Sequence, residues 1–284
     1  MAKVIEPTQA LDVEELKTIS RELRVDIIEM ITEAGSGHPG GSLSAIDALV
    51  CLYFGGFLRY KPSEPGWPER DRFVLSKGHC SPAMYVVLAR AGFFPRDWLK
   101  TFRKFEAKLQ GHVDRIRVPG VEASTGSLGQ GLSVSVGMAI AAKLDKSERR
   151  VWCMVGDGES QSGQVWEAAM SAPKYELDNL CVIVDHNQVQ QTGKVADIMD
   201  LAPLAEKFRA FRWHAIEIDG HDHKAVLEAM REATETSGKP TAIVARTVKG
   251  KGVSWMELSP DWHGKAPNRE QAEQAITEIM GGGR

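Results

Sequence analysis

The alternation of apolar, strand-like runs with helical segments is the feature that most constrains the fold of this chain. The runs Val151–Val155 and Leu180–Val184 are continuously apolar, as in strands that are buried on both faces. Residues 163–172, between them, have a helical pattern. Shorter strand-like runs occur at 73–75, 214–218 and 242–245. Because helices that connect parallel strands must cover the faces of the sheet, we predict an α/β fold: a parallel sheet with helices on both faces.

The remaining segments are predicted to be mainly helical. Residues 12–33 carry one apolar stripe, and Gly35–Gly41 contain too much glycine and proline to continue a helix. Further helices are expected at 43–54, 81–91, 129–144, 222–236 and 268–280. No internal repeat or low-complexity linker divides the chain, so residues 1–284 are expected to form a single domain with a helical N-terminal entry.

Composition excludes several classes of protein. The 284 residues are 43% apolar and 26% charged, which is typical of a globular chain and not of a disordered or fibrous one. No run approaches the roughly 18 apolar residues of a membrane helix, and no secretory signal is visible. The net charge of −3 predicts no general attraction to nucleic acid or to membranes. The four cysteines form no CxxC pair and are expected to be reduced, as in a cytoplasmic protein.

Two of the predicted strands end in residues that can bind a metal ion. Gly156-Asp157-Gly158 follows the first buried run, and Asp185-His186-Asn187 follows the second. If these strands are neighbours, Asp157 and Asn187 meet at the carboxyl edge of the sheet, where oxygen ligands and glycine turns suit Mg²⁺ and a diphosphate. An ordinary turn, with Asp157 capping the next helix, is the alternative. A dinucleotide site is disfavoured, because Gly126–Gly131 reads G-x-x-G-x-G and follows no strand.

Four of the eight histidines lie in glycine-containing loops: His38, His79, His112 and His263. Any one of them alone would be interpreted as an ordinary surface-loop histidine. Together, neutral imidazoles around one anionic or carbonyl ligand would make chemical sense. The other four histidines, His186, His214, His221 and His223, are expected to be ordinary surface-loop histidines without such a role.

From about residue 15 to 275 the chain resembles transketolases. The motifs that carry the resemblance occur in the family's order: Ser36-Gly37-His38-Pro39-Gly40, Asp71–His79, Gly111-His112, Thr125–Gly131, Gly156-Asp157-Gly158-Glu159, Asp185-His186-Asn187 and Trp262-His263-Gly264-Lys265. The closest resemblance is to the N-terminal, thiamine diphosphate-binding subunit of a split transketolase. The resemblance implies a diphosphate-binding domain of the thiamine diphosphate-binding fold. The pyrimidine-binding and C-terminal domains are then expected on a separate chain.

The resemblance also implies a role for each motif residue. Asp157, Asn187 and the backbone carbonyl of Val189 would ligate Mg²⁺, or Ca²⁺ or Mn²⁺ in its place. His38, His112 and His263 would face the sugar, and Glu167 would belong to an acidic network that links two cofactor sites. The residues that would contact thiamine diphosphate are His79, Gly126, Ser127, Leu128, Asp157, Gly158, Asn187, Lys249 and His263.

The implied reaction is the transfer of a two-carbon ketol unit from a ketose phosphate to an aldose phosphate, as in the pentose phosphate pathway. The partner would be a C-terminal transketolase subunit in a heterotetramer. Residues 129–144, a helix with small side chains, would form part of the interface or be an ordinary buried helix. Ser162 stands where the family usually has Glu. Alternatives are the same chemistry on a branched or sulfonated sugar, or a cofactor-binding relative without activity. A 2-oxo-acid dehydrogenase subunit would not be expected to carry the His38 and His263 motifs.

Overall fold

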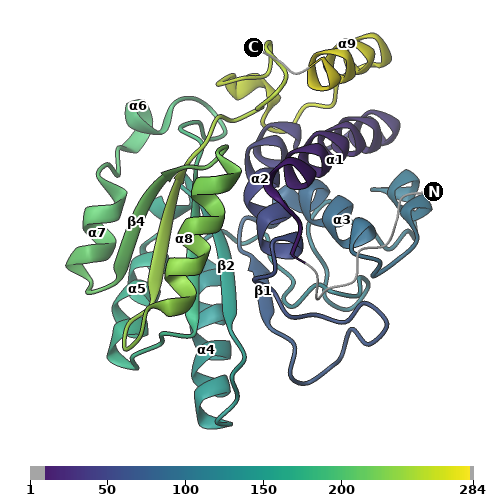
Figure 1. Cartoon of the computed structure of the whole chain (residues 1–284). Helices are drawn as coiled ribbons and strands as arrows, with labels where there is room; N and C mark the ends of the chain where they lie inside the picture. The colour runs from purple at the N-terminus through teal and green to yellow at the C-terminus, as the bar shows by residue number, and fades with distance from the viewer. Residues whose placement is uncertain (1–9, 282–284) are drawn as a thin grey trace.

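The computed structural model describes residues 10–281, and their core is a parallel sheet of five strands (Figure 1). The strands are β1 (Arg72–Leu75), β2 (Val151–Gly156), β3 (Leu180–His186), β4 (His214–Asp219) and β5 (Thr241–Arg246). Their order across the sheet is β1-β2-β3-β5-β4, and every neighbouring pair is parallel. The predicted fold class is confirmed, as are the two long apolar strands at the centre of the sheet.

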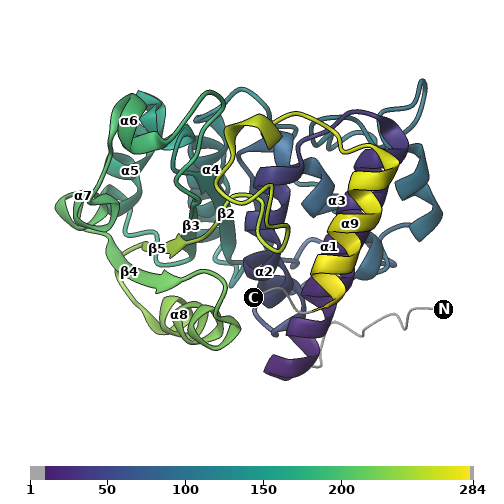
Figure 2. The same cartoon turned by 90° about the horizontal axis from the view of Figure 1, so that it is seen from above.

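Side chains alternate along each strand between two hydrophobic clusters, one on each face of the sheet. Trp152 and Met154 of β2 belong to one cluster, together with residues of the helical segments 13–54, 81–90, 223–235 and 269–280. Cys153 and Val155 belong to the other cluster, together with residues of 130–144, 163–174 and 204–210. Viewed from above, the helices flank the sheet on both sides (Figure 2). Because both faces are covered, the central strands β2 and β3 need no polar side, and this explains their continuous apolar runs.

The long helices match most of the predicted segments. They are α1 (Val13–Ala34), α2 (Pro39–Phe54), α3 (Ser81–Arg90), α4 (Gln130–Leu144), α5 (Gly163–Lys174), α8 (His223–Glu235) and α9 (Arg269–Met280). Two short helices, α6 (Val195–Met199) and α7 (Leu204–Ala210), lie between β3 and β4 and were not predicted. No helix between residues 10 and 281 combines the length and the apolar content needed to cross a bilayer. All four cysteines are buried and unpaired, as expected.

The start of α2 corrects one sequence-based expectation. The segment before residue 43 was expected to be non-helical, yet α2 begins at Pro39. Proline suits the first helical turn, where its missing N–H has no intrahelical partner. A Cβ at Gly40 would lie 3.1 Å from Lys249 Cε, and one at Gly41 would lie 2.8 Å from Cys80 Sγ. The glycines therefore allow the buried end of α2 to approach the functional loops, which offsets their low helix propensity.

Candidate active site

The loops that follow β2 and β3 lie side by side at the carboxyl edge of the sheet. Gly156 is in register with Asp185, and Asp157 N–H donates to the Asp185 carbonyl over 3.2 Å. The Asp157 carboxylate accepts hydrogen bonds from Gly158 N at 2.8 Å and from Gln188 N at 2.6 Å. Asp157 therefore ties the two loops together and does not cap α5, whose N-cap residue is Ser162. The alternative of an ordinary capping aspartate is not supported.

A buried ion pair between Lys77 and Asp185 organises this edge. The Lys77 ammonium, in the loop after β1, contacts Asp185 Oδ2, and Ser44 Oγ of α2 donates to the same oxygen at 2.7 Å. Thr247, just after β5, donates to Asp185 Oδ1. Burial opposes the charge of Asp185, but Lys77 and the hydrogen bonds hold its pKa below the ordinary aspartate value. The pair joins segments from four parts of the chain, and sequence reasoning assigned no role to either residue.

The same group of side chains orients the amide of Asn187. Asn187 Nδ2 donates to Asp185 Oδ2 at 3.1 Å and to Ser44 Oγ at 3.2 Å. With its nitrogen held inward, the amide directs Oδ1 toward the loop backbone, where it accepts from Val189 N at 3.3 Å. The Val189 carbonyl in turn accepts from the ammonium of Lys249 at 2.9 Å. Asp157, Asn187, Val189 and Lys249 therefore lie on adjoining segments of one site.

The four loop histidines form a cluster. The His38 ring centroid lies 5.2 Å from that of His79, 5.4 Å from that of His263 and 6.2 Å from that of His112. His79 and His263 are 5.2 Å apart. The rings come from four loops far apart in the sequence, so their meeting supports the prediction that these histidines act together.

Burial keeps these rings neutral. It lowers the pKa of His38 and of His263 to about 3 and that of His79 to about 4, and nearby cationic groups and imidazoles add to the effect. The pKa of His112, which is more exposed, is also lowered by burial. The cluster therefore presents neutral imidazoles near pH 7.

A glycine-rich loop borders the histidines. A Cβ at Gly126 would lie 2.8 Å from His112 Cδ2, so Gly126 packs directly on that ring, while Ser127 and Leu128 are exposed. The buried carboxylate of Glu159 fixes the end of this loop, accepting from Gly129 N at 2.9 Å and from Ser76 Oγ at 2.5 Å. It also accepts from Gly156 N at 3.0 Å and so connects this loop to the Asp157 turn.

Some of the singled-out residues lie outside this cluster. Glu167 is exposed on α5, and Ser162 packs against Gly129. His221 is not the surface-loop histidine that the sequence suggested, since its Nδ1 lies 2.7 Å from Asp47 Oδ2 and its Nε2 accepts from Val248 N. His223 lies in the same area and hydrogen-bonds Ser20 Oγ at 2.8 Å.

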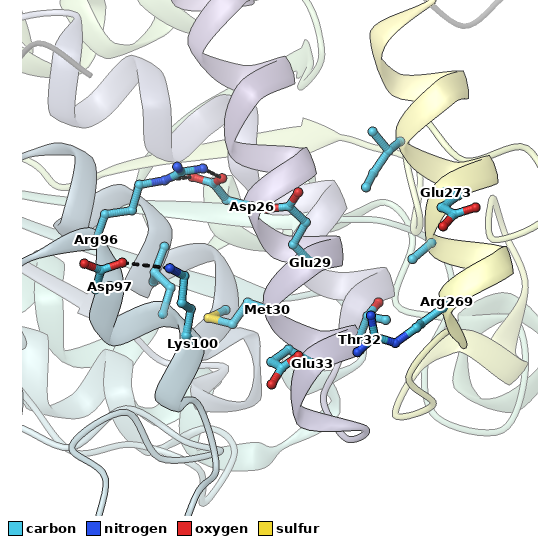
Figure 3. Close-up of a pocket in the computed structure, with 13 residues that line it drawn as sticks. Asp26, Glu29, Met30, Thr32, Glu33, Arg96, Asp97, Lys100, Arg269 and Glu273 are labelled. Carbon is cyan, nitrogen blue, oxygen red and sulfur yellow. Dashed lines mark hydrogen bonds and ion pairs between the residues drawn. The ribbon is translucent and has the colours of Figure 1, made fainter. Parts of the chain in front are cut away.

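A separate groove runs between α1, α9 and the 3₁₀ segment Arg96–Thr101 (Figure 3). Its floor includes Met30 and Leu99, and none of the predicted site residues lines it. Two ion pairs lie in its wall, Arg96 with Asp26 and Lys100 with Asp97. We therefore assign it no part in the chemistry of the histidine cluster.

Comparison with known proteins identifies the family. The profile "Transketolase, thiamine diphosphate binding domain" matches residues 15–281. The chain belongs to the transketolase family. The transketolase of Campylobacter jejuni has the same fold, with a TM-score of 0.90 and 32% identity over 95% of this chain and 43% of that structure. Human transketolase is 42% identical over 93% of this chain and 42% of its own length.

Other members of the transketolase family are similar to this chain over their full length. An apulose-4-phosphate transketolase subunit of Phocaeicola vulgatus is 41% identical, covering 95% of both chains. The 6-deoxy-6-sulfo-D-fructose transketolase subunit of a Clostridium species is 42% identical, covering 95% of this chain and 97% of its own. The chain therefore corresponds to the thiamine diphosphate-binding part of a transketolase and resembles the subunits of similar length in the split enzymes, which are transferases.

The Lys77–Asp185 pair leads to a first prediction. Lys77→Met leaves a buried carboxylate without its counter-charge, so the free energy of unfolding should fall by about 3–5 kcal/mol. Urea denaturation monitored by circular dichroism measures this change. Lys100→Met, at an exposed pair in the groove wall, is the control and should change stability by less than about 0.5 kcal/mol. A Lys77 variant as stable as the control would contradict the structural role of the pair.

A second prediction concerns acid stability. The cluster histidines have folded pKa values below the roughly 6.5 of an unfolded histidine, so the unfolded chain binds more protons below that pH. Their contribution to stability is therefore complete above about pH 6.5 and is lost as the pH falls toward about 4. His263→Gln should make the stability–pH curve shallower between pH 6.5 and 4. His214→Gln, on β4 outside the cluster, leaves the cluster intact and is the control. Equal slopes for His263→Gln and the wild type would refute the assignment.

Proposed function

We propose that this chain is the thiamine diphosphate-binding subunit of a transketolase that transfers a two-carbon ketol unit between sugar phosphates. The observation that carries the proposal is the meeting of the four loop histidines with the Asp157 and Asn187 loops at one edge of the sheet. One part of this site suits a metal-bound diphosphate, and the other suits the hydroxyl and carbonyl groups of a sugar.

The residues of the Asp157 and Asn187 loops fit a divalent cation. No cluster of three or more His, Cys, Asp or Glu side chains within residues 10–281 is arranged for a metal, so the ligands would be one carboxylate and neutral oxygens. Burial and the nearby charge of Asp185 raise the pKa of Asp157, because both disfavour its ionised form. A bound cation would stabilise that ionised form. Asp157, Asn187 Oδ1 and the Val189 carbonyl would hold Mg²⁺, which takes few protein oxygens and completes its shell with phosphate and water.

The neighbouring groups fit the rest of the cofactor. Gly158 leaves backbone accessible beside the metal ligands, and a Cβ there would lie 2.9 Å from Gln190 Cβ. His79 and His263 would hold the diphosphate beside the positive charge of Lys249, and Gly126, Ser127 and Leu128 would line the ring. When bound, thiamine diphosphate supplies the nucleophilic carbon and the electron sink of ketol transfer.

The protein itself would bind and orient the sugar. Neutral His38, His112 and His263 would donate hydrogen bonds to its oxygen atoms, which stabilises negative charge that develops there. A neutral imidazole suits this work because its N–H can donate a hydrogen bond without carrying a permanent charge. The buried Asp185 group and Glu159 would keep the loops that carry these residues in place.

A second chain would complete the site. The relatives of similar length are named subunits, which supports a separate partner with the pyrimidine-binding domain. On this chain, α4 and α5 expose the apolar residues Val134, Leu144 and Met170, which suits a docking surface. Glu167 lies exposed on the same α5 and would enter the acidic network there. We propose a heterotetramer with this face in the interface.

The sugar substrate has two candidate classes. Relatives named for a branched sugar phosphate and for a sulfonated sugar are similar to this chain to nearly the same degree. This supports, as a second candidate, the same ketol transfer on such a sugar. Assays of the reconstituted pair with xylulose 5-phosphate, a branched ketose phosphate and a sulfonated ketose as donors would separate the two.

A third prediction tests the cofactor site. Asp157→Ala should weaken binding of thiamine diphosphate in the presence of Mg²⁺ by roughly 100-fold, because the charged metal ligand is lost. Isothermal titration calorimetry on the chain together with its partner measures the affinity. Asp178→Ala is the matched control, since Asp178 lies before the opposite end of β3 and pairs with Lys143. If the Asp157 variant binds thiamine diphosphate as tightly as the wild type, the proposed metal site is wrong.

A fourth prediction tests the partner surface. Ala141 is exposed on α4, so Ala141→Arg should leave the stability of the chain within about 0.5 kcal/mol of the wild type. The same change should abolish co-elution with the partner in size-exclusion chromatography, because it places a charge in an apolar interface. Ala210→Arg, at the exposed end of α7, is the control and should still co-elute. If the Ala141 variant also co-elutes, α4 is not in the interface.

A further inference from the structure

The ammonium of Lys249 has three close neighbours, all of which must accept a hydrogen bond. Lys249 is buried, and its Nζ lies 2.9 Å from the Val189 carbonyl, 3.4 Å from the Gln190 carbonyl and 2.8 Å from His263 Nδ1. An ammonium group has three N–H donors and no acceptor, so three acceptors satisfy it fully. His263 Nδ1 must then offer its lone pair, and the proton of the neutral ring must sit on Nε2.

His38 is in an equivalent position. Its Nδ1 faces Arg103 Nη2 at 3.4 Å, and Arg103 Nη1 also donates to Ser36 Oγ at 2.5 Å. A guanidinium group carries five N–H donors and no acceptor, so the nitrogen that faces it must again be unprotonated. Gly111 makes room for this group, because a Cβ there would lie 2.7 Å from Arg103 Nε.

We propose that Lys249 and Arg103 are positioning residues that fix the ring protons of His263 and His38 on Nε2. The tautomers are inferred from the geometry alone, and their importance for catalysis rests on the proposed function. Each Nδ1 is occupied by a cationic donor, so the Nε2–H bonds point away from the cations.

The consequence is that the positions of two hydrogen-bond donors in the site are fixed before a substrate binds. An imidazole without such a neighbour can exchange its two tautomers and so act as donor or acceptor at either nitrogen. Here two of the four clustered rings are fixed as donors, which suits oxygen acceptors such as a sugar carbonyl or a hydroxyl lone pair. Nearby cationic groups, Lys249 beside His263 and Arg103 beside His38, also oppose a second proton on each ring.

The ring nitrogens can be observed directly in the full chain labelled with ¹⁵N-histidine. Long-range ¹H–¹⁵N spectra at pH 7 distinguish a protonated ring nitrogen from an unprotonated one, and His263→Gln and His38→Gln assign the signals. We expect an unprotonated Nδ1 and a protonated Nε2 for both rings. A protonated Nδ1 in His263 or His38 of the wild type would overturn the proposal for that ring.

Substitutions then test the cause. Lys249→Met should shift His263 Nδ1 toward the protonated position, and Arg103→Met should do the same for His38. Lys251→Met and Arg115→Met are the controls, since neither side chain contacts a clustered ring, and both should leave the signals unchanged. A Lys249 variant with unaltered His263 nitrogens would refute its positioning role, provided that the signals of His214 and His221 show a folded chain.

The wild-type spectrum is decisive even if the Lys249 variant fails to fold. Neither cofactor, partner nor sugar is present in the experiment, so its result is independent of catalysis. A chain that shows the expected tautomers but no ketol transfer with its partner would retain this inference and lose the proposed function. The reverse result would retain the function and lose the inference.

Discussion

The buried pair of Lys77 and Asp185 is the interaction on which the functional edge of the sheet depends. Removing both charges from water costs several kcal/mol, which is recovered only when the geometry is good and the remaining lone pairs are satisfied. Ser44, Thr247 and Asn187 satisfy them. Since these partners come from α2 and from the ends of β3 and β5, loops distant in the sequence are held in one arrangement. Such a site is preorganised, because groups of the protein itself hold its side chains in place.

The electrostatics of the site follow from this burial. The two lysines at its base, Lys77 and Lys249, lie under rings that are mostly removed from water, and both effects disfavour a positive imidazole. Asp157 experiences the opposite conflict, because it is buried near the negative Asp185. Neutral imidazole donors and the Asp157 carboxylate, which has no counter-charge of its own among residues 10–281, therefore lie next to each other. That combination suits a ligand with a metal-bound anionic end and a neutral, oxygen-rich end.

The sequence predicted the parallel sheet and most long helices correctly, because continuous apolar runs and apolar stripes depend on local periodicity. It also selected the four histidines that meet and the two strand ends that lie side by side, although their roles toward a cofactor stay predictions. It missed Lys77 and Glu159, since a buried charge is recognisable only from partners distant in sequence, such as Asp185 and Gly129. The early start of α2 was missed for a related reason, since the contacts of Gly40 and Gly41 are tertiary.

The distribution of exposure argues that the preorganised edge is one half of a larger site. Asp157, Asn187 and Lys249 are buried, whereas Ser127, Leu128 and His112 are exposed beside them. The proposed ketol transfer passes through a carbanion and needs water to be excluded, and an open rim of this kind does not exclude it. The exposed apolar residues of α4 and α5 begin close to that rim, because α4 starts directly after the Gly126–Gly129 loop. A partner bound to these helices would therefore cover the Gly126–Gly129 loop. Association of the two chains would then also exclude water from the site.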